Sequence, residues 1–518
     1  MVIPTLVFSQ VPLQDTSNKK EIHILRADRL HFEERDTSGQ YQSLAGNVVV
    51  KQQTTTFTCD SAVINKKQNI LEAFGHVHIN DADSIHTYTD YLKYLGNEKK
   101  AYLNKNVRLT DGKGVLTTPA LIYDLSTKTG TYSTGGKLVS GQTVLTSTEG
   151  SYYGETRDVF FRRNVVLLNP DYRVKTDTLL YNLNSDVTTF ITKTQIVTGT
   201  TIIHASDGYY DHRNNKSYFS KRPVIRDGCQ LLIADQVVRV DTLGQASGDV
   251  YYRDSCQGMT LLSNDLRFNT KNKSAIATQK PVAILTRNQD SLFIAADTLF
   301  SGKITDMVNR KIPVITDSSY HLPDLAKDTN TNRYLEAYSH VKIYSDSLQA
   351  VGDSLFYSSR DSAFRLFKKP VVWAQDNQIT GDTIYLFTKN KKPGRVYVFE
   401  NALAINKLSG DYYNQVRGRT LNGLFRQGEI ELFRAKGNAE SIYYGQDENN
   451  RFIGVNKVRS DVIDTYFVNK KPQKVTFIAG VEGDALPMGH INHKEIRLKG
   501  FKILDAERPK SKFDLLGN

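Results

Sequence analysis

The sequence has little cysteine and almost no tryptophan, with 3 Cys and 1 Trp among 518 residues. It has no C-x-x-C pair, which excludes the usual structural zinc motif. No apolar run reaches about 18 residues, so a transmembrane helix is excluded. A complete P-loop, a G-x-S-x-G motif, an H-E-x-x-H motif and a Rossmann fingerprint are also absent. The common signatures of nucleotide-binding, hydrolytic and zinc-dependent enzymes are therefore missing.

The three cysteines, Cys59, Cys229 and Cys256, are too few for a disulfide framework, because an odd count this small allows one bridge at most. Lone cysteines are usually small buried side chains, and we expect that here. A bridge between Cys229 and Cys256 is the alternative that the sequence leaves open.

Basic residues exceed acidic ones, 67 against 55, for a formal net charge of +12. This balance favours an anionic partner such as a membrane surface or a phosphorylated glycolipid. The positive charge is spread along the chain, and its densest run is the short segment 389–392, so we expect no nucleic-acid partner. The 28 Tyr and 23 Phe exclude a disordered chain.

Internal repetition is the strongest pattern in the sequence. Residues 70–79 read ILEAFGHVHI, and residues 334–343 read YLEAYSHVKI. An apolar anchor recurs about every 30 residues: Val48, Val77, Val107, Leu138, Val165, Ile196, Val224, Val250, Val282, Val341 and Val371. A second column, nearly all Asp, follows each anchor by about twelve residues: Asp28, Asp60, Asp90, Pro119, Glu149, Asp177, Asp207, Asp235, Asp265, Asp297, Asp353, Asp382 and Asp411.

The residues around both columns alternate between apolar and polar and are rich in β-branched and aromatic types, which predicts strands. Each repeat therefore holds about two strands. His, Asn, Asp or Pro directly precedes most anchors, which predicts a corner where the strand bends between two sheets. We expect a second corner at the Asp column, with the carboxylates accepting backbone N–H groups. The predicted fold is all-β: an elongated, antiparallel repeat with stacked units that share one interior.

The repeats divide the chain into five predicted segments. Residues 1–20 are an apolar N-terminus that resembles the remnant of a signal peptide, and we expect an exported protein. Residues 21–300 and 339–430 carry the repeats. Residues 301–338 are predicted to be an irregular insertion or a degenerate repeat, and residues 431–518 a divergent β region with a polar tail.

The repeat motif resembles that of the OstA/LptA family, the lipopolysaccharide-transport bridge proteins. The matching copies are TDYLKY at 89–94, AYLNKNV at 101–107 and LEAFGHV at 71–77. The resemblance implies a β-jellyroll shaped like an open, twisted V, with a periplasmic location in a Gram-negative envelope. It further implies a groove for lipid A acyl chains, end-to-end strand addition to other jellyroll proteins, and contacts with an inner-membrane extraction complex and an outer-membrane translocon. This chain is much longer than a single bridge subunit of that family.

The candidate site follows from the anchors. The predicted lining of the lipid groove is Val77, Ile79, Val107, Leu109, Val165, Leu167, Val282, Ile284, Val341, Ile343 and Val371. The alternative is that these side chains form a dry core. Cations beside the anchors are predicted to meet lipid phosphates at a groove rim: Lys105, Arg108, Arg162, Arg163, Lys221, Arg222, Lys368 and Lys369. For each of these, ordinary surface charge is the alternative.

The sequence predicts neither an enzyme nor a bound cofactor or metal. One Asp in nearly every repeat is the wrong distribution for a catalytic site, which needs a few singular residues. His76, His78 and His86 provide too few ligands for a metal. Two other classes stay open: a polysaccharide-binding protein or enzyme, for which Trp373 is the candidate sugar platform, and a surface adhesin.

Overall fold

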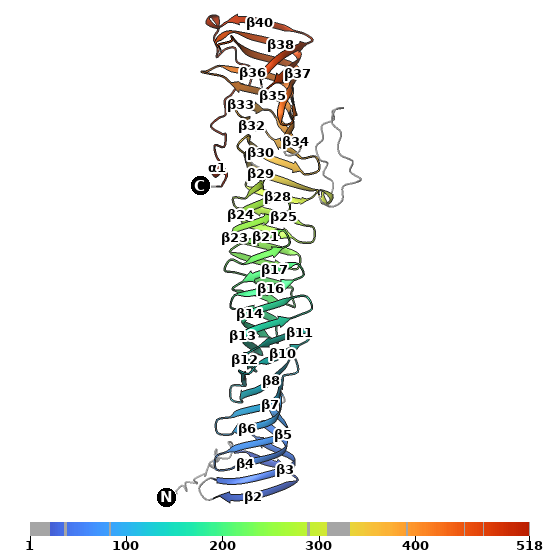
Figure 1. The fold of residues 1–518 in the computed structure, drawn as a ribbon, viewed down its shortest axis with the longest axis vertical. Coiled ribbons are helices and arrows are strands. Elements are labelled where there is room, and N and C mark those ends of the chain that lie inside the picture. Colours follow the sequence, from blue (N-terminus) through green and yellow to red (C-terminus); the bar gives the residue numbers. More distant parts are fainter. Residues whose placement is uncertain are drawn as a thin grey trace, which may run out of the picture. The chain divides into compact units, whose positions relative to one another are not determined.

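A computed structural model describes residues 21–35, 39–81, 84–286, 291–307, 332–389, 392–449, 451–469 and 471–516. The predicted N-terminal segment 1–20 lies outside the described residues. The chain divides into two compact units, Met1–Ile225 and Arg226–Asn518. Both units are built almost entirely from antiparallel strands (Figure 1). The prediction of an all-β repeat fold is therefore confirmed.

The strands of unit 1 are β1 (His23–Arg26), β2 (Arg29–Arg35), β3 (Gly39–Gln52), β4 (Thr55–Asn65), β5 (Ile70–Asp81), β6 (Ile85–Leu95), β7 (Lys100–Thr110), β8 (Val115–Asp124), β9 (Thr129–Tyr132), β10 (Gly136–Ser140), β11 (Thr143–Ser147), β12 (Glu149–Tyr153), β13 (Asp158–Leu168), β14 (Arg173–Asn182), β15 (Val187–Phe190), β16 (Thr194–Thr198), β17 (Thr201–Ala205), β18 (Gly208–Asp211) and β19 (Lys216–Phe219). The boundary between the units falls within β20 (Val224–Asp227).

The strands of unit 2 are β21 (Gln230–Ile233), β22 (Gln236–Val240), β23 (Leu243–Asp254), β24 (Met259–Asn269), β25 (Ser274–Thr278), β26 (Val282–Thr286), β27 (Ser291–Ala295), β28 (Thr298–Lys303), β29 (Arg333–Tyr344), β30 (Gln349–Ser358), β31 (Ala363–Phe367), β32 (Val371–Ala374), β33 (Asn377–Thr380), β34 (Thr383–Lys389), β35 (Lys392–Lys407), β36 (Tyr413–Arg426), β37 (Glu429–Gln446), β38 (Phe452–Val468), β39 (Lys471–Ile478) and β40 (Glu482–Pro487). Among the described residues, unit 2 also contains the one-turn elements η2 (Ile304–Asp306), η4 (Met488–His490) and α1 (Phe513–Leu516).

Each long strand bends near its middle and contributes to two facing sheets. In β5, Ile70–Phe74 pairs with β4 and β6 on one side of the bend, and Val77–Asp81 pairs with the same two strands on the other side. We call the sheet that contains Ile70–Phe74 the first arm, the sheet that contains Val77–Asp81 the second arm, and the free strand ends of the two arms the mouth. The apolar interior lies between the arms.

The bend consists of two consecutive residues with positive φ, which explains the register shift at that point in the ladder. The pairs are Gly46/Asn47, Gly75/His76, Lys105/Asn106, Arg163/Asn164, Lys221/Arg222, Gly248/Asp249, Gln279/Lys280, Ser339/His340, Lys368/Lys369, Glu400/Asn401, Gly437/Asn438 and Ala479/Gly480. The predicted corner before the anchor is confirmed. Where Pro precedes the anchor, the pair lies one residue earlier, because proline cannot adopt positive φ.

The Asp column lies opposite these bends, but its partners differ from the prediction. Asp60 Oδ2 lies 2.8 Å from His76 Nδ1, Asp90 Oδ2 accepts from Asn106 Nδ2 at 2.7 Å, and Asp297 Oδ2 lies 2.9 Å from His340 Nδ1. These partners are side chains of the bend, whereas we expected backbone N–H groups. The expectation was wrong for these three because the left-handed bend turns its own second side chain toward the carboxylate.

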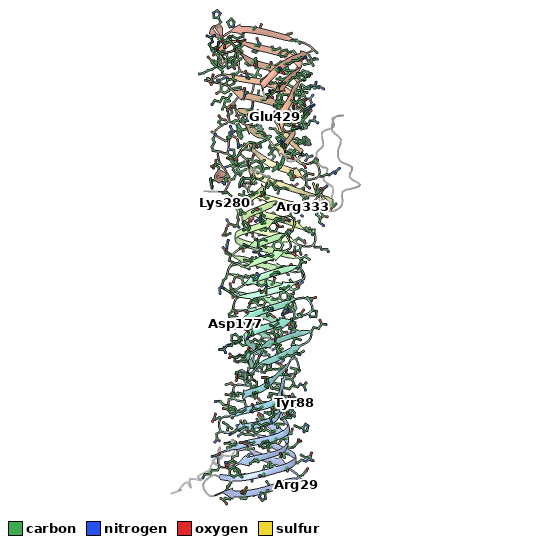
Figure 2. The ribbon with its side chains drawn as sticks, viewed as in Figure 1. Arg29, Tyr88, Asp177, Lys280, Arg333 and Glu429 are labelled. Carbon is green, nitrogen blue, oxygen red and sulfur yellow. A yellow bond between two sulfur atoms is a disulfide. The ribbon has the colours of Figure 1, made fainter. Side chains whose placement is uncertain are left out.

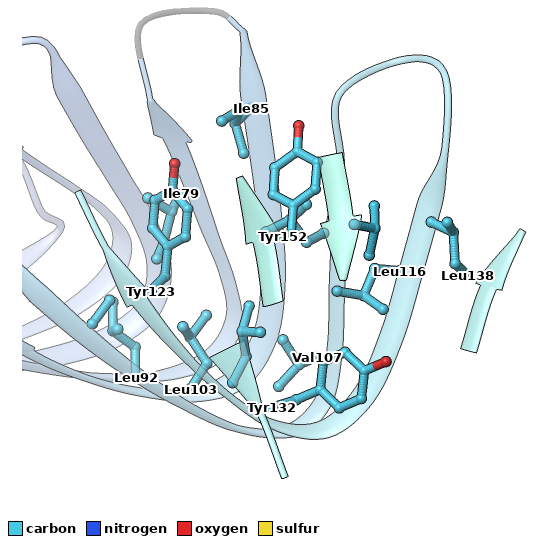
Figure 3. Packing of buried hydrophobic residues seen from close by; sticks show 14 of the residues in the cluster. Ile79, Ile85, Leu92, Leu103, Val107, Leu116, Tyr123, Tyr132, Leu138 and Tyr152 are labelled. Atoms are coloured by element: carbon cyan, nitrogen blue, oxygen red, sulfur yellow. The ribbon is translucent and has the colours of Figure 1, made fainter. Parts of the chain in front are cut away.

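The interior of unit 1 is one apolar cluster that extends from Ile22 to Phe219. Side chains from both arms meet in it, as Leu103 and Val107 do on either side of the bend of β7 (Figure 3). The two-residue period of the strands sends every second side chain inward, and the two-residue bend preserves that alternation. No single repeat encloses its own apolar face, so neighbouring repeats stabilise one another by stacking.

Two further segments contradict or refine expectations. β28 pairs directly with β29, so the chain between Lys303 and Arg333 is inserted between two neighbouring strands. Its residues 308–331 lie outside the described residues. Cys229 and Cys256 form a disulfide with Cα atoms 5.7 Å apart, contrary to the expectation of free thiols, while Cys59 is free and buried.

Candidate functional site

Eight of the eleven predicted groove residues lie on the inner side of the arms, in pairs such as Val107 and Leu109, and pack between the arms. Val282, Ile284 and Val371 lie on the outer face of the second arm, the face that carries Lys342. The expectation was wrong for these three because a proline takes the first inward position after the bend. Ten of the eleven are between 0% and 4% exposed, and Ile284 is half-buried. Their contact with a lipid stays a prediction.

Tyrosines of the first arm bridge the mouth of unit 1. The Tyr123 hydroxyl donates to Asp81 Oδ2 at 3.3 Å, and the Tyr152 hydroxyl donates to Asp111 Oδ2 at 3.2 Å. Tyr94 makes the same kind of bond to Gln52. Each tyrosine lies near the free end of the first arm, and each acceptor at or just beyond a free end of the second arm. We call these three bonds the mouth seam.

Burial dominates the electrostatics of the mouth seam. It raises the pKa of Tyr94, Tyr123 and Tyr152, and the neighbouring carboxylates raise the pKa of each further. The hydroxyls therefore stay protonated and act as donors at every physiological pH. Figure 3 shows Tyr123 and Tyr152 between the strands with their hydroxyls directed away from the bend. The mouth seam thus encloses the apolar interior.

A further bridge forms at the other end of unit 1. The Tyr172 hydroxyl lies 3.0 Å from His212 Nδ1, and Thr188 Oγ1 lies 2.8 Å from His212 Nε2. Burial lowers the pKa of His212, which favours the neutral ring. The sequence analysis did not find these bridges. The signal was present, because Tyr94, Tyr123, Tyr152 and Tyr181 recur about every 29 residues.

The eight predicted rim cations are exposed, but they lie at or beside the bends rather than at the mouth. Several pair with acidic side chains of the neighbouring strand: Arg163 with Glu149 at 2.9 Å, and Lys368 with Asp353 at 2.8 Å. Arg108 lies over the ring of Tyr88, 5.5 Å from its centroid. A groove rim would lie at the strand ends, so this placement differs from the expected one. Phosphate contact stays a prediction.

The three histidines weighed as metal ligands separate into two contacts. His76 belongs to the bend and pairs with Asp60, while His78 Nε2 lies 3.1 Å from His86 Nδ1. The bend therefore separates His76 from His78. Within the described ranges, no group of three or more His, Cys, Asp or Glu side chains is arranged to hold a metal ion.

Comparison with known proteins assigns part of the chain. The family model described as OstA-like protein matches residues 19–177. We call residues 19–177 the OstA-like segment. The predicted resemblance to the OstA/LptA family is confirmed over this OstA-like segment, which contains the mouth seam and strands β1 to β13.

Two other comparisons add little. No curated protein matches the chain. Among solved structures, the chain is similar to LptH, the LptA-homologous periplasmic component of the lipopolysaccharide transport device from Pseudomonas aeruginosa, at 19% identity and a TM-score of 0.18. That match covers 21% of this chain and 80% of LptH. The helices in the described part of the chain are all short, and none has the length and apolarity needed to cross a membrane.

Proposed function

We propose that this protein is a non-enzymatic lipid conduit of a Gram-negative envelope, which holds the acyl chains of lipopolysaccharide between its arms and helps carry it across the periplasm. One observation carries the proposal: an apolar interior that continues from rung to rung through unit 1. Burial of an acyl chain in such an interior is favourable by about 0.8 kcal/mol per CH₂ group. The match of residues 19–177 to the OstA-like family supports the same function.

Loading requires the arms to part, because the interior is filled by its own side chains. The mouth is the place where they can separate, since side-chain hydrogen bonds close it, whereas the backbone continues through the bend. Lipid would then enter along the strand ends and replace contacts between the two arms. The eight cations at the bends are proposed to attract the anionic lipid to the outer surface.

End-to-end assembly is the proposed mode of partner binding. β2, which begins at Arg29 (Figure 2), pairs with β3 along one edge and lies at the N-terminal end of the stack. Its Leu30 and Phe32 are 59% and 50% exposed. An edge strand with exposed apolar side chains is a template for a strand from another chain. The proposed partners are jellyroll proteins of a transport bridge, the extraction complex and the translocon.

The polysaccharide alternative loses its main support. Trp373, its candidate sugar platform, is 1% exposed and lies opposite Gln378 on the outer face of the second arm, where it is covered. A buried indole cannot stack on a sugar at the surface. No comparable observation favours the adhesin alternative.

In-cell photocrosslinking tests the proposal. A photoreactive residue at Val107, Val165 or Val341 should form lipopolysaccharide adducts, detected by blotting. The outward positions Asn104 and Lys342, which are exposed on the same strands as Val107 and Val341, serve as controls. Adducts at the inner positions alone support the conduit. Adducts at none of them would show that the interior is a dry core and would refute the proposal.

A further inference from the structure

The mouth seam of unit 1 follows a fixed spacing that continues one repeat further toward the N-terminus. Each tyrosine of the seam comes 41 or 42 residues after its acceptor, as Tyr94 does after Gln52. Ile64 follows Ile22 by the same interval. Ile64 also has the register of the tyrosines, because it pairs with Leu71, which in turn pairs with Tyr94. Two apolar side chains therefore stand in the first repeat where a hydrogen bond closes the mouth in the next three.

A cavity of about 550 Å³ lies between the arms at this position. Glu21 and Ile22 line it from the second arm, and Ile64, Lys66 and Lys67 line it from the first arm. Its volume falls within the range of about 300–1,000 Å³ that small-molecule sites occupy. Ile22 and Ile64 are 6% and 1% exposed and belong to the apolar cluster of unit 1, so the floor of the cavity is continuous with the interior.

A buried acceptor without a donor lies beside this floor. Gln42 pairs with Ile64 in the ladder, so the two side chains share the inner face of the first arm. Gln42 is 9% exposed, and its Oε1 has no hydrogen-bond partner among the described residues. A buried polar atom that is left unpaired is destabilising. A hydroxyl or amide N–H group of a bound molecule would satisfy this oxygen.

Two cations lie at the cavity on the first arm. Lys66 and Lys67 are exposed in the turn between β4 and β5, which is part of the mouth. The cations predicted for a groove rim lie at the bends instead. Glu21 and Glu34 also line the cavity, so a phosphate group is stabilised only beside the two lysines. The cavity thus combines an apolar floor with a cationic group at one side.

We propose that this part of the mouth, formed by Ile22, Gln42, Ile64, Lys66 and Lys67, is the entry port through which a phosphorylated amphiphile inserts its acyl chain between the arms. The inference rests on the proposed lipid function and assigns to it the place where loading begins. Ile22 and Ile64 can part without the loss of a hydrogen bond, whereas each of the next three repeats must first break a bond of the mouth seam. Contacts that cost less to break open more often.

The first experiment closes the entry port in the full chain. Ile22→Gln with Ile64→Tyr copies the Gln52–Tyr94 pair one repeat earlier, and the cavity leaves room for the larger ring. Uptake of a fluorescent monoacylglycerol, followed by stopped-flow fluorescence, should slow roughly tenfold, the effect of one added hydrogen bond. Ile122→Tyr is the matched control, because Ile122 is 44% exposed on the outer face of the first arm, and uptake should be unchanged.

The second experiment tests the phosphate contact with two probes that carry the same fluorescent acyl chain. Lysophosphatidic acid has a phosphate group, and the monoacylglycerol has none. Lys66→Gln with Lys67→Gln should slow uptake of lysophosphatidic acid roughly tenfold, at the lower end of electrostatic steering, and leave uptake of the monoacylglycerol unchanged. Lys271→Gln with Lys273→Gln, in an exposed turn of unit 2, is the control for loss of charge and should slow neither probe.

The third experiment uses the native chain, so it stays decisive if a variant fails to fold. A fatty acid that carries a photoactivatable diazirine is mixed with the protein and illuminated after increasing delays, and the adducts are mapped by mass spectrometry. We expect the first adducts on β3 and β4, around Gln42 and Ile64, and later adducts on β13, around Phe161, which is fully buried in the same cluster.

The outcomes separate the entry port from the conduit. Unchanged uptake in the Ile22→Gln, Ile64→Tyr variant, or first adducts outside β3 and β4, would overturn the inference and leave the conduit proposal intact. An effect of the Lys66→Gln, Lys67→Gln variant that is absent, or equal for the two probes, would overturn the assignment of the phosphate to these lysines. No uptake and no adducts in the native chain would overturn the conduit proposal, and the entry port with it.

Discussion

The mouth seam allows a quantitative prediction at Tyr152. This side chain is 2% exposed and donates to Asp111, whereas the next residue, Tyr153, is 41% exposed on the other side of the same strand. Tyr152→Phe removes one hydroxyl and leaves the ring in place. Tyr153→Phe removes the same atom from the surface and is the matched control.

The expected cost follows from the partners of Asp111. Its carboxylate keeps two backbone donors, Lys113 N at 3.0 Å and Gly114 N at 3.1 Å, and the Arg157 guanidinium at 3.6 Å. A hydrogen bond to a charged group contributes about 1.5–3 kcal/mol, and the remaining partners favour the lower half of that range. We expect a loss of about 2 kcal/mol in local stability.

Native-state hydrogen exchange measures this loss. At about 1.4 kcal/mol per factor of ten, protection of the amides in β11, β12 and β13 should fall roughly thirtyfold in Tyr152→Phe. The control Tyr153→Phe should leave protection unchanged. Equal effects of the two substitutions, or no effect of Tyr152→Phe, would refute the idea that the mouth seam holds the arms together.

Three further predictions follow from single sites. Val107→Asp should abolish binding of an acyl probe in unit 1, because an unpaired buried carboxylate costs several kcal/mol. Asn104→Asp, on the exposed face of the same strand, should retain binding, and equal losses in both would contradict the assignment of Val107 to the interior. The hydrogen bond from His76 to Asp60 raises the pKa of His76 above its ordinary 6.5, so its stabilising contribution is complete below pH 6.5 and is lost as the pH rises through the raised pKa. An NMR titration should show a lower midpoint in Asp60→Asn, and an unchanged midpoint would contradict this. Replacing Cys229 and Cys256 by Ala should destabilise unit 2 by up to about 3 kcal/mol in denaturant unfolding, whereas Cys59, whose pKa burial raises to about 11, should react with maleimide only after unfolding.

The local features of the fold were predictable because they repeat. Val107 follows Asn106, and Val341 follows His340, so the bend and the inward anchor could be identified from residue type and spacing alone. The partner of each Asp was not predictable in the same way. Asp60 contacts His76 because the bend of β5 brings that side chain across to β4, and the direction of a side chain at a bend depends on backbone angles that the spacing does not reveal.

The contacts across the mouth could not be predicted from the sequence either, because they depend on the tertiary arrangement of the strands. Tyr123 meets Asp81 from a position more than one repeat away, and only the stacking and bending of the strands bring the two together. The disulfide between Cys229 and Cys256 likewise depends on two strand ends that lie side by side once the ladder has formed. The sequence does not show whether the mouth lies at the bends or at the strand ends. Cations at the bends, such as Lys368, were therefore predicted to lie at a groove rim.

By itself, the sequence determined that the protein is an all-β repeat, where many of its strands bend and which side chains face inward at anchors without a preceding proline, since these depend on local periodicity and backbone preference. Only the tertiary structure decided how the interior is enclosed. Tyr152 closes the mouth of unit 1 on Asp111, and Tyr123 closes it on Asp81. Both contacts join residues that are distant in sequence and become neighbours only when the repeats stack. The local sequence pattern therefore does not predict them.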